Sequence, residues 1–338
     1  MQNDIDVFGC DVGYFQVKWV VRRNGAIETG NYPSVAIRKM RSSTATATAT
    51  AADMFIDHKT NVEIEIGDVT YEVDTSPDSI AGSRTARAET DNFPREDEYA
   101  ALVFASLVAI QARKVRLMVL GLPLHTMRHA EFLKQRFEGT HNLRQHGICT
   151  VEKVAVIPQP LGALAYLRVA APLAATPSTT ACLVDSGWHT TDLITVENGK
   201  KVDHARSVGR PGGAAVVIRE VARLVGESIG ERIENIDRID RALRCRHPLH
   251  VYGKAVDLQP FLRDALHVTY PIVKALLTVV GTCEDLVVYG TGGAACYYAD
   301  ALKRTLGFDV YTVDRPQLVN AIGFVLAGEA ATKPRRIS

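Results

Sequence analysis

The chain has 338 residues, of which 46% are hydrophobic and 23% charged, and its 39 basic side chains nearly balance 38 acidic ones. This length predicts two domains. A formal net charge of +1 provides no field that would concentrate nucleic acid or anionic lipid, so charge implies neither partner. No apolar run reaches the ~18 residues of a membrane span, and the start lacks the pattern of a signal peptide. Because the six cysteines are far apart and form no CxxC pair, we expect reduced, mostly buried thiols in a cytoplasmic protein.

Strand patterns dominate the first part of the chain. Residues 4–37 predict three strands, with breaks at Gly13-Tyr14 and at Asn24-Gly25, of which the second is a strong hairpin signal. Residues 42–52, SSTATATATAA, form a low-complexity stretch that is typical of a mobile loop. Alternating side chains resume over residues 61–74, which indicates further strand structure.

Helical and strand patterns interleave through the rest of the chain. Helices are predicted over residues 96–113, 128–139, from about Leu161, over 212–246 and 258–281, after Gly293, and at 320–330. Strands are predicted over residues 114–124, 150–158 and 285–290, and three more lie within 179–202. This interleaving indicates an α/β protein, and the tandem hairpins indicate mixed sheets.

A glycine turn with an acidic and a basic neighbour lies in GCDVGYFQVKWV, residues 9–20. A strand ends at Asp11, Gly13 lets the backbone turn tightly, and Lys18 lies on the returning strand. Backbone N–H groups of such a turn form an anion site, and a lysine adds a point charge. The carboxylate can hold the waters of Mg²⁺. An ordinary hairpin with a solvated aspartate and lysine is the alternative.

The same arrangement recurs in CLVDSGWHTTD. It contains a strand-ending aspartate, a turn glycine, a histidine, two threonines and a second aspartate, which are Asp185, Gly187, His189, Thr190, Thr191 and Asp192. Alone, the segment could be an ordinary turn, a phosphate loop or a histidine-bearing catalytic site. Its similarity to the first loop is an internal repeat of the kind that duplicated domains show. Two facing hairpins could clamp a polyphosphate, with Asp11 and Asp185 sharing the metal.

Three further segments could contact a nucleotide. Gln159 stands between two prolines ahead of a helix, where it could orient an attacking water or be an incidental polar residue at a corner. Gly290-Thr291-Gly292-Gly293 separates a strand from a helix, which favours close approach of the backbone to a nucleotide. Its spacing is not GxGxxG, so a dinucleotide site is disfavoured. Gly212 and Gly213 open another helix and could lie near a ribose or phosphate.

Taken together and in this order, these segments resemble the actin-like ATPase superfamily over nearly the whole chain. DVGYFQVK resembles its first phosphate loop, PQPLGA the first connector, DSGWHTTD the second phosphate loop, YGTGGAA the adenosine loop, and NAIGF at 320–324 the second connector. The DVGYxxVK opening and the Gly-aromatic-X-Thr-Thr-Asp loop are most similar to the ParM/StbA group of plasmid-segregation actins, including PRTRC-type ParM-like proteins.

The resemblance implies a two-domain α/β fold that duplicates a ribonuclease H-like unit. It implies mixed five-stranded sheets and a nucleotide cleft between the domains. Domain I would cover residues 1–160 and be completed by a C-terminal helix at 319–330. Domain II would cover 161–318, and 331–338 would be a tail.

The resemblance also implies roles for individual residues. Asp11 and Asp185 would arrange Mg²⁺ and water, and Gln159 would position the lytic water. Gln159 is uncharged, as in actin, where ParM carries a glutamate. The residues expected to bind ATP or ADP are Gly13, Tyr14, Lys18, Ser186, Gly187, Thr190, Thr191, Gly212, Gly213, Gly290, Thr291, Gly292 and Gly293. The resemblance does not explain Trp188 and His189.

The implied function is that of a cytoskeletal ATPase. Subunits would polymerise with ATP and Mg²⁺, and hydrolysis would destabilise the filament and drive plasmid segregation. The expected partners are copies of the same chain and a DNA-binding adaptor protein, with no direct contact to nucleic acid or membrane. A small-molecule, sugar-type kinase on the same fold and a non-hydrolysing nucleotide-dependent scaffold are the alternatives. The non-hydrolysing scaffold is disfavoured because the chain retains Asp11 and Asp185 together with Lys18 and Gln159.

Overall fold

The computed structural model describes five stretches of the chain, residues 3–39, 61–77, 90–170, 180–199 and 201–332. They form two compact units. The first holds the described residues up to Val156 except Gly121–Arg128, and the second holds Gly121–Arg128 together with the described residues from Ile157 onward. The loop predicted at 42–52 and residues 333–338 of the predicted tail lie outside the described residues.

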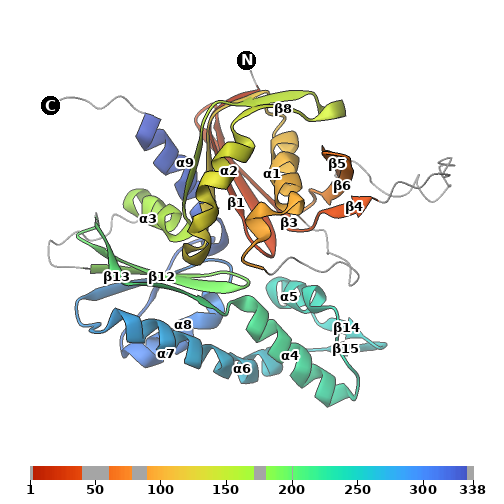
Figure 1. Ribbon diagram of the computed structural model, residues 1–338. Coiled ribbons are helices and arrows are strands. Elements are labelled where there is room, and N and C mark those ends of the chain that lie inside the picture. Colours follow the sequence, from red (N-terminus) through yellow and green to blue (C-terminus); the bar gives the residue numbers. More distant parts are fainter. Residues whose placement is uncertain (1–2, 40–60, 78–89, 171–179, 200, 333–338) are drawn as a thin grey trace. The chain divides into compact units, whose positions relative to one another are not determined.

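A seven-stranded mixed sheet is the base of the first unit (Figure 1). Its order is β3-β2-β1-β7-β9-β8, and β10 also pairs with β7. The β1–β2–β3 meander and the β8–β9 pair are antiparallel, whereas β1–β7 and β7–β9 are parallel. The strands are β1 (Asp4–Val12), β2 (Gln16–Arg23), β3 (Ala26–Pro33), β7 (Lys114–Leu122), β8 (Gly139–Asn142), β9 (Ile148–Val151) and β10 (Val154–Pro158).

A smaller sheet and two helices complete the first unit. The sheet has the order β4-β6-β5, from β4 (Ile37–Lys39), β5 (Asn61–Ile66) and β6 (Val69–Asp74). In β5 the buried Val62 and Ile64 alternate with exposed glutamates, as the sequence predicted. The helix α1 (Asp97–Ala109) contacts β1, β5 and β6, and α2 (Ala130–Phe137) follows β7.

The second unit has a five-stranded mixed sheet with helices on both faces (Figure 1). Its order is β13-β12-β11-β16-β17, from β11 (Thr180–Ser186), β12 (Thr190–Glu197), β13 (Lys201–Pro211), β16 (Leu286–Thr291) and β17 (Tyr311–Thr312). A separate hairpin joins β14 (Leu249–Val251) and β15 (Lys254–Val256). The helices are α3 (Gln159–Ala170), α4 (Ala214–Ile229), α5 (Ile236–Cys245), α6 (Gln259–Ala265), α7 (Thr269–Val280), α8 (Ala295–Leu306) and α9 (Val319–Thr332).

Both main sheets share one plan. Three antiparallel strands are followed by a strand that runs parallel to the first of them, β7 beside β1 and β16 beside β11. This confirms the predicted duplicated α/β architecture. The five-strand expectation holds for the second sheet but is wrong for the first, because β8, β9 and β10 add to it. The β8 segment GTHN has no apolar alternation from which a strand could be predicted.

The predicted helical run at 212–246 forms two helices. The helix α4 ends at Gly230, whose φ of +77° is the left-handed conformation that favours glycine at a helix C-terminus. Asn235 then caps α5, since its side chain accepts a hydrogen bond from the backbone N–H of Arg238 at 3.3 Å. None of the described helices is long and apolar enough to cross a lipid bilayer.

The six cysteines are unpaired thiols. Cys10, Cys149 and Cys182 are buried, whereas Cys245 and Cys296 are exposed, so the expectation of mostly buried thiols holds for only some of them. Burial raises the pKa of Cys10 to about 12, which makes this thiol unreactive at neutral pH.

Helices α3 and α9 cross at two glycines within the second unit. A methyl group on Gly323 would lie 1.7 Å from the carbonyl oxygen of Gly162, so neither helix can carry a larger residue there. The Phe324 ring is fully buried beside this crossing, and Leu167 and Val319 belong to the core under the sheet. The predicted domain boundaries assigned α9 to domain I, whereas in the structure it groups with α3 in the second unit.

We predict that Gly323→Ala destabilises the fold by at least about 2 kcal/mol, because the added methyl overpacks the crossing. Gly290→Ala is the matched control, since its methyl would meet Ala295 at an ordinary 3.8 Å. Urea unfolding of both variants measures the difference. Equal unfolding midpoints for the two would contradict a tight α3–α9 contact.

Candidate functional site

The turn between β1 and β2 holds a partly buried ion pair. Asp11 lies opposite Lys18 in the strand register, and Lys18 Nζ is 3.4 Å from Asp11 Oδ2. Asp11 is only 3% exposed. The Gly13 N–H donates to the carbonyl of Gln16 at 3.1 Å and closes the turn, and a methyl at Gly13 would lie 3.1 Å from Lys18 Nζ. Glycine therefore leaves room for the ammonium group at the loop.

The Tyr14 side chain is part of the packing of the first unit. Its ring is buried and stacks on Phe93 with centroids 5.8 Å apart, and its hydroxyl donates to the Thr90 carbonyl at 3.3 Å. The sequence predicted Tyr14 as a nucleotide-binding residue. With the ring used in this way, what Tyr14 can offer a ligand is its backbone.

The turn between β11 and β12 repeats the first one. The Gly187 N–H donates to the carbonyl of Thr190 at 2.9 Å, as Gly13 does to Gln16. In both loops an aspartate stands two residues before the glycine, at the end of the strand. The repeat predicted from the sequence is therefore present in the backbone hydrogen bonds.

Residues ahead of α4 brace this second loop. The Gly212 N–H donates to the His189 carbonyl at 2.8 Å, and the Thr191 hydroxyl donates to the Gly212 carbonyl at 2.7 Å. Thr191 is fully buried. The sequence predicted Gly212 and Thr191 as nucleotide contacts, but these bonds give both a role in holding the loop.

The first turn of α4 also binds the loop. The N–H groups of Ala214 and Ala215 donate to the carbonyls of Gly187 and Trp188, both at 2.9 Å. A methyl on Gly213 would lie 2.5 Å from both carbonyl oxygens, so Gly213 is required for this close contact. The Trp188 side chain is buried, which gives it a packing role that the sequence left open.

The loop between β16 and α8 lies directly on the second turn. The Ala294 N–H donates to the Ser186 carbonyl at 2.8 Å. Gly292 has a φ of +85°, and a methyl there would lie 2.4 Å from Asp185 Oδ1. Thr291 is buried and its hydroxyl faces the Val184 carbonyl at 3.5 Å. Of the residues in this loop, position 292 thus has the strongest requirement for glycine.

A residue pair that the sequence did not single out lies beside this loop. Arg244 donates from Nε to Asp240 Oδ2 at 2.7 Å on α5, and its Nη2 would lie 3.8 Å from a methyl on Gly293. In the sequence the pair looks like an ordinary i,i+4 salt bridge on a helix surface. Only the approach of Gly293 shows that the guanidinium faces the predicted adenosine loop.

Asp185 is buried among polar groups. Asn320, at the start of α9, donates from Nδ2 to Asp185 Oδ2 at 2.7 Å, and both residues are about nine-tenths buried. Three buried atoms of this neighbourhood have no hydrogen-bond partner among the described residues, namely Ser186 Oγ, Asp192 Oδ1 and Asn320 Oδ1. Each such orphan costs about 1–3 kcal/mol. Asn320 and Asp192 both interact with the Asp185 carboxylate, and their unsatisfied oxygens indicate a place that is completed by a polar ligand and its waters.

Asp192 is a second buried carboxyl, opposite Asp185 in the strand register. Burial and, to a lesser extent, the charge of Asp185 raise its pKa to about 8, and a hydrogen bond from the Leu124 backbone N–H opposes the shift. Gly209 makes room for the group, since a methyl there would lie 2.2 Å from Asp192 Oδ1. Asp192 is therefore protonated at neutral pH and adds no second negative charge beside Asp185.

Gln159 is the first residue of α3, where the sequence predicted a corner with the helix starting two residues later. It is buried, and a methyl on Gly121 would lie 3.0 Å from its Cγ. The predicted site residues thus fall into two groups. The first unit contains Asp11, Gly13, Tyr14 and Lys18, and the second contains all the others.

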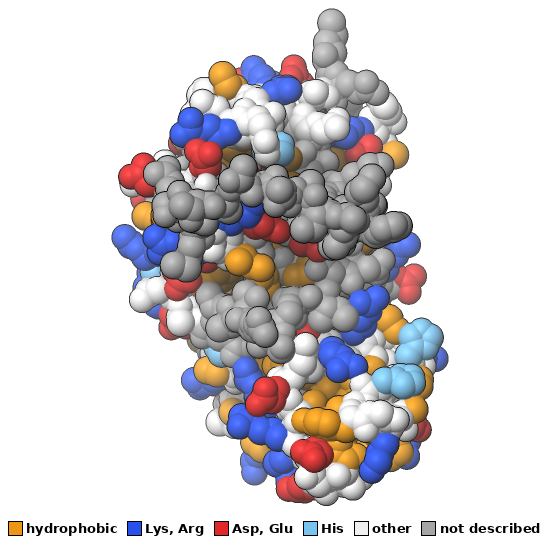
Figure 2. Space-filling model, turned by 90° about the vertical axis from the view of Figure 1, so that its right-hand side faces the viewer, with side chains coloured by type: hydrophobic (Ala, Val, Ile, Leu, Met, Phe, Trp, Pro, Cys, Tyr) orange, Lys and Arg blue, Asp and Glu red, His pale blue; other side chains and the backbone are white. Residues whose placement is uncertain are grey.

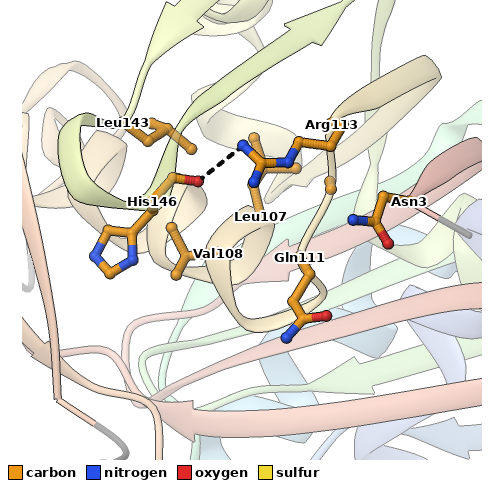
Figure 3. Close-up of a pocket in the computed structure, with 8 residues that line it drawn as sticks. Asn3, Leu107, Val108, Gln111, Arg113, Leu143 and His146 are labelled. Atoms are coloured by element: carbon orange, nitrogen blue, oxygen red, sulfur yellow. Dashed lines mark hydrogen bonds between the residues drawn. The ribbon is translucent and has the colours of Figure 1, made fainter.

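Among the residues that the structure describes, no three His, Cys, Asp or Glu side chains gather into a metal cluster. A cavity of about 400 Å³ lies elsewhere, at the C-terminal end of α1 (Figure 3). Arg113 on its wall donates from Nη1 to the His146 carbonyl at 3.2 Å. None of the predicted site residues lines it.

Residues 9–162 match the family model described as the actin like proteins N terminal domain. Among solved structures, the archaeal actin homologue Ta0583 is 19% identical, with 96% of this chain and 100% of the other covered and a TM-score of 0.76. The complex of the same homologue with ADP is 18% identical, with 96% of this chain and 100% of the other covered and a TM-score of 0.72. The subunit of a 15-stranded ParM filament from Clostridium botulinum is 18% identical, with 97% of this chain and 99% of the other covered and a TM-score of 0.73. No curated protein matches the sequence.

We predict that Asp192→Asn flattens the pH dependence of stability. The folded-state pKa of about 8 lies above the ordinary value of 3.8, so the folded protein keeps a proton that the unfolded chain loses. Stability therefore falls as pH rises from about 4 to 8, by up to about 1.4 kcal/mol per pH unit. Urea unfolding in EDTA without nucleotide, from pH 5 to pH 8, measures this slope. The same slope in wild type and variant would show that Asp192 is ionised.

Proposed function

We propose that this chain, which has an actin-like fold and matches the actin like proteins N terminal domain over residues 9–162, is a filament-forming ATPase of the ParM/StbA type. It polymerises with ATP and Mg²⁺, hydrolyses ATP, and moves plasmid DNA through a DNA-binding adaptor protein. The observation that carries this proposal is the buried Asp185, whose neighbours Asp192 and Asn320 each have a buried oxygen without a hydrogen-bond partner among the described residues.

The two glycine turns are the proposed phosphate-binding elements. Lys18 supplies a positive charge at the first turn, and the buried hydroxyls of Ser186 and Thr190 supply donors at the second. Because the pKa of Asp192 is raised to about 8, this carboxyl adds little negative charge beside Asp185 at neutral pH. This distribution suits a polyphosphate that arrives with a cation.

Asp185 fits a Mg²⁺ ion bound through its waters, since this ion takes one or two carboxylates together with phosphate oxygens. The orphaned oxygens Asp192 Oδ1 and Asn320 Oδ1 fit the ordered waters of such a site. When bound, the ion neutralises the charge that develops on the phosphate during transfer.

Gln159 is the proposed water-positioning residue. Its amide can both accept from and donate to a water but is not a base. It is the first residue of α3 and is buried, with its Cγ beside Gly121. Positioning without general-base catalysis agrees with slow hydrolysis, as a filament whose lifetime is set by its nucleotide requires.

The β16–α8 loop is the proposed adenosine site. Gly290, Gly292 and Gly293 let the backbone pass close to the nucleoside, and Arg244 lies beside Gly293 with a planar cation that can stack on a base. A related fold binds ADP, as the complex of the archaeal actin homologue does.

Self-association and an indirect link to DNA complete the proposal. The Clostridium botulinum relative forms a 15-stranded filament. Basic and acidic side chains are interspersed on the face shown in Figure 2, and the net charge of the chain is +1. The near-neutral net charge gives no field that would concentrate DNA, which is why an adaptor protein is proposed as the DNA-binding partner.

Light scattering tests the filament. On addition of ATP and Mg²⁺ to tens of micromolar protein, we expect the signal to rise and then decay as ATP is hydrolysed. Phosphate must appear without any added acceptor, because a kinase would need one. A flat scattering trace would contradict the filament, and ADP formation that needs an added acceptor and releases no free phosphate would favour the kinase. Electron microscopy with ATP and with a slowly hydrolysed analogue shows whether filaments form.

Two substitutions test the roles in hydrolysis. Asp185→Ala should abolish phosphate release, because the carboxylate that holds the metal waters is lost. Gln159→Ala should slow release about 10²-fold and leave ATP binding within twofold, since one positioning group is removed. Turnover is measured by phosphate release and binding with a fluorescent ATP analogue. Unchanged turnover in either variant would overturn that assignment.

A further inference from the structure

The hydrogen bond between Asn320 and Asp185 joins positions that are 135 residues apart in the chain. Asp185 is a carboxylate and can only accept, so the nitrogen end of the Asn320 amide must face it. The bond is 2.7 Å long, which is typical of a charge-assisted hydrogen bond. Both residues are 6% exposed, so water cannot easily replace the donor.

The backbone of Asn320 is held in place by the α3–α9 crossing. A methyl on Gly162 would lie 2.6 Å from the Asn320 carbonyl oxygen, and a methyl on Gly323, about one turn later, would lie 1.7 Å from the Gly162 carbonyl oxygen. The helix α9 therefore cannot slide or rotate on α3 without a clash. The Asn320 amide is consequently fixed in space by the same helix that carries Gln159 at its start.

We propose that Asn320 is a positioning residue for the Mg²⁺–nucleotide complex, which holds the Asp185 carboxylate in the orientation that binds the metal waters. This inference rests on the proposed function. Asn320 suits the role because it donates to one carboxylate oxygen without adding charge, whereas a lysine or arginine would neutralise Asp185 and weaken its hold on a cation. Loss of such an outer hydrogen bond typically lowers metal affinity about 10–100-fold.

The test measures ADP affinity with Mg²⁺ and with EDTA. In Asn320→Ala we expect the affinity for Mg²⁺–ADP to fall at least about tenfold and the affinity in EDTA to stay within twofold of wild type. Asn61→Ala is the matched control, because Asn61 Nδ2 also donates to a carboxylate, Glu72 Oε1 at 3.0 Å, but on an exposed surface. Both affinities of the control should equal those of wild type.

Other outcomes separate the alternatives. If both affinities of Asn320→Ala fall together, or neither changes while its urea midpoint drops, Asn320 is a structural residue and the inference is wrong. If Asn320→Ala does not fold, Asn320→Ser is tested in its place. The shorter serine side chain also removes the amide donor to Asp185 but leaves a smaller cavity, and this variant must show the Mg²⁺-selective loss. If wild type itself binds no ADP in either condition, the proposed function fails before any variant is compared.

Discussion

The burial of one carboxylate organises the candidate site of the second unit. Asp185 ends β11 inside the protein, and an ionised carboxylate there costs several kcal/mol unless donors surround it. Asn320 supplies one donor, and the neutral state of Asp192 avoids a second charge. Gly292 then allows the next loop to approach within contact distance of the same group. The ends of two strands, a loop and the start of α9 thus meet around one charge.

The first unit meets the same requirement differently. Its turn has the same backbone hydrogen bond from glycine, but Asp11 is compensated by the cation of Lys18 where Asp185 has the neutral amide of Asn320. The repeat is therefore one of backbone geometry and not of charge. In the proposed function this difference leaves a positive charge for phosphate at one turn and a well-oriented acceptor for metal waters at the other.

Much of the architecture could be predicted because local sequence patterns specify its hairpins and its order of strands and helices. Asn24-Gly25 and the alternation around Val62 and Ile64 specify hairpins, and the order of strands and helices specifies an α/β fold with mixed sheets. Where local patterns were weak, the prediction failed. The β8 strand lacks apolar alternation, and Gln159 sits in a helix despite its flanking prolines, since Pro160 occupies the first turn, where its missing N–H costs nothing.

The sequence by itself determined the two Asp-x-Gly turns, because a strand end, a glycine and a returning strand lie within a few residues. It could not determine what faces those turns. The partners of Asp185 are Gly292 and Asn320, more than a hundred residues away, and the guanidinium of Arg244 reaches its loop only after α5 packs. Likewise the raised pKa of Asp192 arises from burial, which a linear pattern does not contain. Tertiary structure decided these points because desolvation and hydrogen bonding depend on which distant segments meet.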